Sequence, residues 1–220
     1  MPTAVITGAN RGIGLELARQ LSARGDTVIA VCREPSAELD ALGVRVEKGI
    51  DVVETGAPEV LARRLKGVAI DILVNNAGIL RHESLNDLEI DSIREQFEVN
   101  ALGPLRMTSA LLKLMGPGGK VVIVTSRMGS MADNGSGGYY GYRMSKAAVN
   151  AAGVSLARDL AGQGIAVALL HPGMVATDMT GRQGIPPEEA AKGLIARIDA
   201  LTIATTGRFL HGQTGDILPW

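Results

Sequence analysis

The chain has 220 residues, a length that suits one α/β domain with a core of its own. Aromatic residues make up only 3% of it, so we expect a core of Val, Ile, Leu and Ala, which suits helices packed closely on a parallel sheet. The formal net charge is −1, and acidic and basic residues are mixed along the sequence. This balance argues against nucleic acid or an anionic membrane as a partner.

The sequence shows no pattern typical of a disulfide-stabilised, secreted or membrane-spanning protein. Cys32 is the only cysteine, which excludes an intrachain disulfide and fits a reducing compartment. The first residues, MPTAVITGAN, lack a charged stretch followed by a long apolar run, and no segment approaches the roughly 18–20 apolar residues of a membrane span. The three histidines show no metal-binding spacing. We therefore expect a cytoplasmic protein without a metal site.

Short apolar runs alternate with longer amphipathic segments. The runs predict strands over residues 4–7, 27–32, 44–47, 70–76, 120–126, 165–171 and 208–210. Segments with helical spacing, such as 13–25 and 56–67, lie between them. This order predicts a single domain over residues 1–220, a Rossmann-like, doubly wound parallel sheet of about seven strands with helices on both faces.

Two segments interrupt the alternation. Residues 130–138 are rich in Gly, Asn and Ser, and residues 178–189 place glycines before Pro186 and Pro187. Both are predicted to be loops, and a helix is expected to begin where the second one ends. Ligands of open α/β sheets bind outside the carboxyl ends of strands, which is where both loops lie. We expect 178–189 to be a mobile substrate loop.

The first strand runs into three glycines. In VITGANRGIG (5–14) these are Gly8, Gly12 and Gly14, with the spacing G-x-x-x-G-x-G. Gly8 permits a tight turn, Gly12 lets a pyrophosphate approach the backbone, and Gly14 lets the helix lie close to the sheet. A plain strand-to-helix turn is the alternative. The position on the first strand of an alternating chain favours a dinucleotide site.

The end of the second strand bears on the choice of dinucleotide. An NAD site usually has an acidic residue there, whereas this chain has Cys32 followed by Arg33, and Arg11 lies within the glycine turn. Two guanidinium groups suit a ribose 2′-phosphate, so NADP(H) is predicted over NAD(H). Solvated surface arginines are the alternative. Asp51, after the third strand, either accepts from the adenine amino group or caps the next helix.

The fourth strand ends in the sequence NNAG, residues 75–78. The small residues Ala77 and Gly78 let the backbone approach a ring or a ribose. The amides of Asn75 and Asn76 are expected to tie neighbouring strand ends together, and so to support the site more than to contact substrate.

All three tyrosines lie in GGYYGYRMSK (137–146). Residues four apart share a helix face, which pairs Tyr142 with Lys146 and Tyr139 with Arg143. A phenol has a reference pKa of about 10, and a neighbouring cation lowers it. Lys146 can do this and also bind ribose hydroxyls. We therefore predict Tyr142 as the proton donor, because the pair of Tyr139 and Arg143 lies a turn earlier.

A serine completes the predicted group. The strand over 120–126 ends at Ser126, whose hydroxyl is placed to hold a carbonyl oxygen beside the phenol. Ser130, in the following loop, is the alternative. We favour Ser126, because a strand end holds a side chain more firmly than a loop does.

Taken together, TGANRGIG, NNAG, Ser126 with Tyr142 and Lys146, and HPGMVATDM (171–179) resemble the short-chain dehydrogenase/reductase family over nearly all of the chain. Tyr142 lies 16 positions after Ser126, a spacing slightly longer than is usual in the family. The stretches GGYYGYRMSKAAVN and GRFLHGQTGDILPW are most similar to the carbonyl-reductase branch that includes sniffer and C-factor proteins.

The resemblance implies roles for individual residues. Its catalytic set is Asn100, Ser126, Tyr142 and Lys146, in which Asn100 interrupts its helix and binds a water that links Lys146 to solvent. Pro172, Gly173 and Thr177 contact the nicotinamide end, and Val175 offers its backbone to the carboxamide. The complete cofactor set that it implies is Gly8, Asn10, Arg11, Gly12, Ile13, Gly14, Arg33, Asp51, Val52, Asn76, Ala77, Gly78, Tyr142, Lys146, Pro172, Gly173, Val175 and Thr177.

The expected function is the NADPH-dependent, reversible reduction of a small ketone or aldehyde to an alcohol. A nucleotide-binding signalling protein of the C-factor type with little turnover is the alternative, since fold does not determine function. The intact Ser, Tyr, Lys and Asn set favours the enzyme. One long helix predicted over 84–115 and another over 139–162 suit a four-helix interface in a homodimer or homotetramer.

Overall fold

A computed structural model describes all 220 residues and contains one seven-stranded sheet. Every neighbouring pair of strands is parallel, in the order β3-β2-β1-β4-β5-β6-β7. The strands are β1 (Thr3–Thr7), β2 (Thr27–Val31), β3 (Arg45–Glu47), β4 (Ile70–Asn75), β5 (Met115–Val124), β6 (Ala166–His171) and β7 (Phe209–His211). The seven predicted strands and the Rossmann-like sheet are therefore confirmed. The strand order reverses between β1 and β4, where open α/β sheets bind their ligands.

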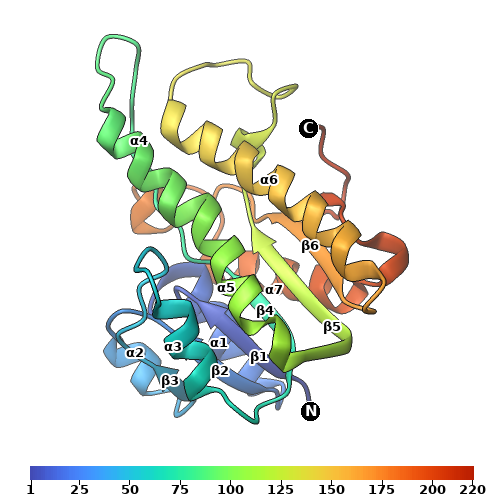
Figure 1. The fold of residues 1–220 in the computed structure, drawn as a ribbon. Coiled ribbons are helices and arrows are strands. Elements are labelled where there is room, and N and C mark those ends of the chain that lie inside the picture. The colour runs from blue at the N-terminus through green and yellow to red at the C-terminus, as the bar shows by residue number, and fades with distance from the viewer.

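Helices cover both faces of the sheet (Figure 1). They are α1 (Gly12–Ala23), α2 (Ala37–Asp40), α3 (Ala57–Arg64), α4 (Ile90–Phe97), α5 (Gly103–Leu111), α6 (Tyr140–Ala161) and α7 (Pro187–Ala200). Helices α1 and α7 pack side by side over one face, while α3 and α5 pack together over the other. In Figure 1, α4 and α6 extend beyond the carboxyl ends of the strands, where the predicted site lies.

Small aliphatic side chains form the core, as the composition predicts. In β1, Ala4 and Ile6 face the layer of α1 and α7, whereas Val5 faces the layer of α3 and α5. All three side chains are fully buried. This period of two, apolar on both faces, is typical of a strand at the centre of a parallel sheet.

The continuous helix expected within 84–115 is wrong. Ser84 pairs with Asp87 in an antiparallel bridge, and α4 begins only at Ile90. A π-helical turn, Glu98–Leu102, then separates α4 from α5. Pro104 gives the physical reason: it has no N–H to donate to the carbonyl of Asn100, and its ring disturbs the helix before it. The backbone N–H of Gly103 bonds to the carbonyl of Glu98, five residues earlier.

The predicted loop after β6 is organised at its base. Val175 pairs with Ile185 in a parallel bridge, and Asp178–Thr180 forms one turn of 3₁₀ helix. Helix α7 begins at Pro187, close to the predicted end of the loop. The mobility of residues 178–189 stays a prediction. Among the helices, none has both the length and the apolar character needed to cross a membrane.

Candidate active site

The glycine turn joins β1 to α1 through contacts that leave no room for side chains. Gly8 has φ of +66°, and a Cβ atom there would lie 2.9 Å from Cα of Ala77. A Cβ atom on Gly14 would overlap the carbonyl oxygen of Gly8 and the amide of Asn76. That amide donates to the carbonyls of Thr7 and Gly8, both at 3.1 Å. The ends of β1 and β4 are thus tied together.

The N-terminus of α1 fits an anionic group. It has no side-chain cap and no acidic residue in its first turn, so protein side chains do not satisfy its first N–H groups. Such an end binds phosphate through its N–H groups and its helix dipole. The turn between β1 and α1 contains Asn10 and Arg11, and α1 begins with Gly12 and Ile13, so these four predicted cofactor residues lie at this end of the helix.

The segment after β6 lies over the glycine turn. The methyl group of Thr177 is 3.2 Å from the position of a Cβ atom on Gly12, and Arg11 Nη1 is 3.6 Å from Asp178 Oδ2. Gly173 follows Pro172 with φ of +90°. The side chain of Val175 is buried and its carbonyl accepts from the N–H of Thr177 at 2.8 Å and from the hydroxyl of Thr180, which leaves its N–H as the group that can serve a ligand. The structure therefore brings Thr177, one of the predicted nicotinamide-end residues, next to the predicted pyrophosphate turn.

Arg33 and Asp51 lie together beyond β2 and β3. Arg33 Nη1 is 3.5 Å from Asp51 Oδ2, and the arginine side chain is 74% exposed, so it is free to turn toward a ligand. Asp51 Oδ1 accepts from the backbone N–H of Val53 at 3.2 Å. Helix α3 begins at Ala57, after Gly56, so Asp51 does not cap it. Val52 is buried against Gly103 of α5.

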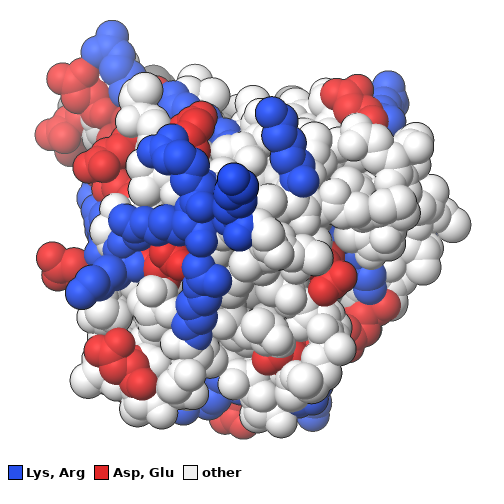
Figure 2. All heavy atoms as spheres, turned by 60° about the horizontal axis from the view of Figure 1, so that its bottom comes forward, with Lys and Arg blue, Asp and Glu red and all other residues white.

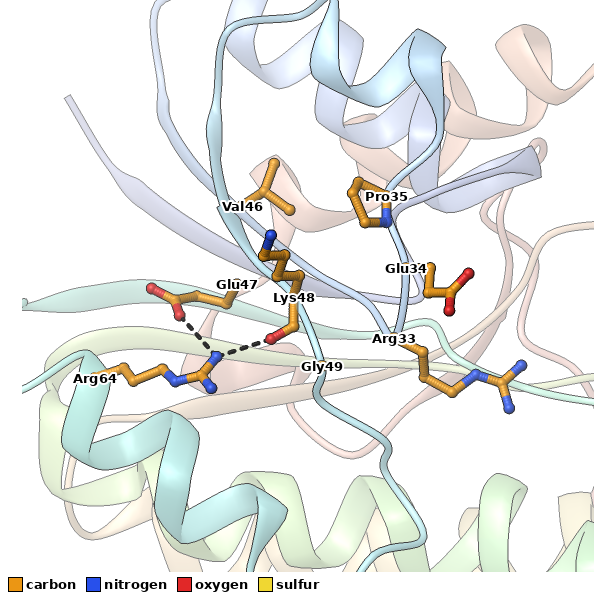
Figure 3. A pocket seen from close by; sticks show the side chains of 8 residues that line it. All are labelled: Arg33, Glu34, Pro35, Val46, Glu47, Lys48, Gly49 and Arg64. Carbon is orange, nitrogen blue, oxygen red and sulfur yellow. Dashed lines mark hydrogen bonds and ion pairs between the residues drawn. The ribbon is translucent and has the colours of Figure 1, made fainter.

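A hollow of about 780 Å³ opens beside Arg33, between the loops that follow β2 and β3 (Figure 3). Arg64 closes one side by donating to Glu47 at 3.4 Å and to the carbonyl of Lys48 at 2.8 Å. The side chain of Arg33 points away from this pair (Figure 3). Basic side chains gather on part of the molecular face drawn in Figure 2, with acidic ones beside them. Arg33 lines this hollow, whereas Tyr142 does not.

Helix α6 places Tyr142 and Lys146 one turn apart on its buried face. Their exposed fractions are only 8% and 5%. The ammonium of Lys146 donates to the carbonyl of Val124, at the end of β5, at 3.0 Å and lies 5.7 Å from the centre of the Tyr142 ring. A Cβ atom on Gly78 would approach Lys146 Nζ to 3.7 Å, so the small residue after β4 keeps this space open.

Burial shifts the pKa of both groups. It raises the pKa of Tyr142, and the nearby Ser126 hydroxyl offsets part of that rise. It also lowers the pKa of Lys146 to about 8. The predicted lowering of the phenol pKa by Lys146 is not what the structure shows. The ammonium lies over the ring and bonds to Val124, and burial is the largest influence on the phenol.

Two serines follow β5, and they have different surroundings. The hydroxyl of Ser126 accepts from the backbone N–H of Met128 at 3.1 Å and lies on the Tyr142 side, where it lowers the phenol pKa. The hydroxyl of Ser130 instead accepts from the backbone N–H of Asp133 at 3.1 Å. The structure thus brings Ser126 toward Tyr142 and leaves Ser130 in a loop turn.

The alternative pair of Tyr139 and Arg143 is not assembled as an acid with its activating cation. Tyr139 precedes α6 with φ of +52°, and its ring packs edge-on against His82 at 4.6 Å between centres. Arg143 Nη2 donates to the hydroxyl of Ser136 at 2.9 Å, and its Nε donates to the carbonyl of Gly138 at 3.2 Å. Arg143 therefore braces the loop that precedes α6.

Asn100 lies in the π-helical turn and is fully buried. Its amide both donates to and accepts from the backbone of Ile79, each at 2.8 Å, and donates to the hydroxyl of Ser145 at 3.1 Å. Ser145 in turn donates to the carbonyl of Tyr142 at 2.8 Å. The side chain is thus used to hold the two segments that border the site, and Pro104, four residues further on, has no N–H to donate to the backbone carbonyl of Asn100.

Sequence reasoning missed three residues that shape the site. A Cβ atom on Gly129 would overlap the backbone of Lys146, and one on Gly141 would overlap the amide of Gln96. Glu83 is a buried carboxylate bonded to the first turn of α6. The glycines adjoin predicted site residues, which is a usable signal. Glu83 lies in an irregular segment without periodicity, so no local pattern indicates it.

Comparison with known proteins assigns the chain to a class. Residues 2–185 match the family of short chain dehydrogenases, and the chain belongs to the short-chain dehydrogenase/reductase family of oxidoreductases. A relative from Rhodococcus sp. (strain AD45), 1-hydroxy-2-glutathionyl-2-methyl-3-butene dehydrogenase, is 48% identical over 100% of both chains. The C-signal protein of Myxococcus xanthus is 44% identical over 69% of this chain and 93% of its own length.

Solved structures confirm the branch that the motifs indicate. The NADPH-bound carbonyl reductase from chicken fatty liver superposes with a TM-score of 0.91 at 26% identity, over 100% of this chain and 99% of the other. The carbonyl reductase Sniffer of D. melanogaster superposes with a TM-score of 0.91 at 27% identity, over 100% of both chains. The present chain is thus an oxidoreductase of this family, similar to carbonyl reductases.

Proposed function

We propose that this protein is an NADP(H)-dependent oxidoreductase that reduces a ketone or aldehyde to an alcohol and also runs in reverse. One observation supports this proposal most strongly. Ser126, Tyr142 and Lys146 are brought together at the carboxyl end of β5, and all three are buried. A pure binding protein has no need of a buried phenol beside a lysine and a serine.

The proposed chemistry divides between the cofactor and the chain. When bound, the nicotinamide supplies the hydride that reduces the carbonyl carbon. Ser126 holds the carbonyl oxygen through its hydroxyl. Tyr142 donates its proton to the same oxygen, and its raised pKa keeps the phenol protonated at neutral pH. In the direction of oxidation, Tyr142 must accept the proton instead.

Lys146 and Asn100 complete the proposed proton path. Lys146 has a pKa of about 8, close to neutral pH, so it can take up a proton and release it again. Pro104 cannot donate to the carbonyl of Asn100, which lacks the bond that a regular helix makes at this position. We infer that a water on this carbonyl links Lys146 to solvent and so returns the proton to Tyr142.

The residues around the glycine turn fit a dinucleotide with a 2′-phosphate. The turn and the N-terminus of α1 would hold the pyrophosphate. Arg33 would exchange its partner Asp51 for the 2′-phosphate, and Arg11 would exchange Asp178 in the same way. Related structures with bound NADPH or NADP support the preference for NADP(H) over NAD(H). Val175 would offer its backbone to the carboxamide, between Gly173 and Thr177.

Two relatives suggest different roles. The name of the Rhodococcus relative describes an alcohol with a glutathionyl group on the neighbouring carbon, so such a thioether alcohol is a second candidate substrate for this chain. The Myxococcus relative is named as a signal, which supports the non-enzymatic alternative. The assembled Ser126, Tyr142 and Lys146 favour the enzyme, acting in the cytoplasm on a small molecule. A homodimer or homotetramer stays part of the proposal.

A substrate panel with a matched variant tests the proposal. Ketones, aldehydes and a glutathionyl alcohol are assayed by NADPH absorbance, with NADH in parallel, for the wild type and Tyr142→Phe. We expect turnover with at least one substrate, and a fall of ~10²–10⁴-fold in kcat for Tyr142→Phe with unchanged NADPH binding. Tyr139→Phe is the control, and its kcat should stay near that of the wild type. Near-normal turnover by Tyr142→Phe would contradict the proposed acid.

A further inference from the structure

Glu83 is a buried carboxylate that belongs neither to the proposed proton path nor to the proposed cofactor site. It lies in the segment that follows β4 and is 1% exposed. One oxygen accepts from the hydroxyl of Ser92 at 2.8 Å and, through a short hydrogen bond, from the amide of Gln96. The other oxygen accepts from the backbone N–H of Gly141 at 3.2 Å. Three donors from two helices thus converge on one carboxylate.

The bond to Gly141 places Glu83 at the start of α6, immediately before Tyr142. The carbonyl of Glu83 also accepts from the backbone N–H of Tyr139 at 2.9 Å, so its backbone and its side chain hold the same helix end. Gly141 makes this contact possible, because a Cβ atom there would overlap the amide of Gln96 and approach Cα of Ile93 to 3.0 Å.

Helix α4 and the π-helical turn hold the same segment from the other side. Gln96 accepts through its amide oxygen from the backbone N–H of Arg81 at 3.0 Å. Asn100, about one turn further on, holds Ile79 and reaches Ser145 of α6. The segment 79–83 is therefore fastened to α4 through Arg81 and to the π-helical turn through Ile79, and Glu83 continues this connection to the first turn of α6.

The physical chemistry favours a precise geometry here. Burying a carboxylate away from solvent lowers the stability of the fold unless hydrogen bonds satisfy its oxygens, and Glu83 accepts three such bonds. It also lies at the positive end of a 22-residue helix, where the dipole favours negative charge. The loss of one donor, or of the charge, leaves a buried polar group unpaired, so the arrangement resists small shifts of α6.

We propose that Glu83 is a positioning residue for Tyr142: its carboxylate holds the first turn of α6 at the place where the phenol meets the substrate carbonyl. This inference rests on the proposed function of Tyr142. A displacement of about 1 Å at a reacting group can reduce turnover by as much as ~10²-fold, so a residue outside the site can affect kcat strongly.

Glu83→Gln tests the carboxylate without changing its volume. If the oxygen of the new amide accepts from the N–H of Gly141, its NH₂ group faces the NH₂ group of Gln96. If the amide is flipped, its oxygen accepts from Gln96, but its NH₂ group then faces the N–H of Gly141. One donor opposes another in either orientation. The double variant Glu83→Gln/Gln96→Glu moves the carboxylate to position 96. There it accepts from both the new amide and the backbone N–H of Arg81, which restores the network with the same total charge.

We expect Glu83→Gln to lower kcat by ~10-fold or more, with KM and the NADPH dissociation constant changed by less than about twofold. The double variant should recover most of the loss. Glu95→Gln is the matched control, because Glu95 lies on the same helix in an exposed pair with Arg81 and should leave kcat unchanged. A kcat of Glu83→Gln close to that of the wild type, or a loss that the double variant deepens, would overturn the inference.

Two further measurements keep the test decisive. Hydrogen exchange over residues 139–146 needs no substrate, and we expect it to be at least ~10-fold faster in Glu83→Gln and slow again in the double variant. Unchanged exchange overturns the inference even if no substrate is found, whereas turnover by Tyr142→Phe overturns only the proposed function.

If Glu83→Gln does not fold, Ser92→Ala removes a single donor, and it should lower kcat by about twofold to fivefold at unchanged NADPH affinity. An unchanged kcat in that variant overturns the inference.

Discussion

Tyr142 and Lys146 are neighbours on one helix face, and burial moves their pKa values in opposite directions. It favours the neutral form of each group, so the phenol keeps its proton to higher pH and the ammonium loses its proton more readily, with a pKa of about 8. A protonated phenol suits the reduction of a carbonyl, where the acid must donate. Oxidation of an alcohol needs the phenolate, so that direction should speed up as the pH rises.

Arg33 offers a residue-scale test of cofactor choice. In Arg33→Ala we expect the dissociation constant of NADPH to rise by ~10–100-fold, the effect of losing a charge-assisted bond to phosphate, while that of NADH changes little. Fluorescence titration of both cofactors measures the difference. Arg19→Ala is the control, because Arg19 pairs with Glu16 on α1 and has no predicted ligand. Equal losses for NADPH and NADH would contradict the assignment.

At the scale of elements, the site depends on how closely α1 approaches the sheet. Gly14→Ala places a methyl group against the carbonyl of Gly8, so β1 and α1 must separate. We expect a loss of about 1–3 kcal/mol in the free energy of unfolding, measured in urea, together with weaker NADPH binding. Gly162→Ala is the control: its Cβ atom meets nothing within 4 Å and its φ is −66°. That variant should be neutral or slightly more stable.

The loop over 178–189 provides a second test at this scale. Its base is fastened by the bridge between Val175 and Ile185, but Arg182 is exposed and has φ of +63°. We expect trypsin to cut after Arg182 in the free protein, and at least ~10-fold more slowly with NADPH and substrate, because closure would protect the loop. Cleavage after Lys66, in an exposed turn that follows α3, is the internal control. Equal protection at both places would argue against closure of this loop.

At the scale of the whole molecule, buried titratable groups make stability depend on pH. His171, at the end of β6, has a pKa of about 4 because of burial and the nearby His211 and Arg127. The unfolded chain binds a proton at a pKa of about 6.5, so this contribution is complete above that pH and is lost as the pH falls toward 4. Lys146 affects stability in the basic range. Its buried ammonium destabilises the folded state in full below about pH 8, and this destabilisation is relieved as the pH rises toward 10.5, the ordinary pKa of a lysine.

Urea unfolding of His171→Gln at pH 7 and pH 4.5 tests the acidic range. The wild type should lose about 2–3 kcal/mol more than the variant between these two values, because the variant has no imidazole to protonate. Carboxylates titrate in both proteins, so the difference between the proteins isolates the histidine. Parallel losses in wild type and variant would show that His171 is not responsible.

Local patterns predict much of this protein because they arise from local physics. The alternation of apolar runs with amphipathic segments reflects the periods of strand and helix, and the structure contains the seven strands it indicates. The helix expected within 84–115 was wrong, because its periodicity gave no sign of the turn at Ser84 or of the interruption before Pro104. A proline inside a helical pattern was the available signal.

The sequence by itself determined the alternation of strands with helices, the glycine turn, and the shared helix face of Tyr142 and Lys146, since each depends on residues a few positions apart. Tertiary structure alone decided that burial, and not the lysine, has the largest effect on the phenol pKa. It also decided that Ser126 faces Tyr142 and that Glu83 holds α6 across 58 residues of chain. Desolvation and long-range hydrogen bonds depend on which segments pack together, and no local period of the sequence encodes that packing.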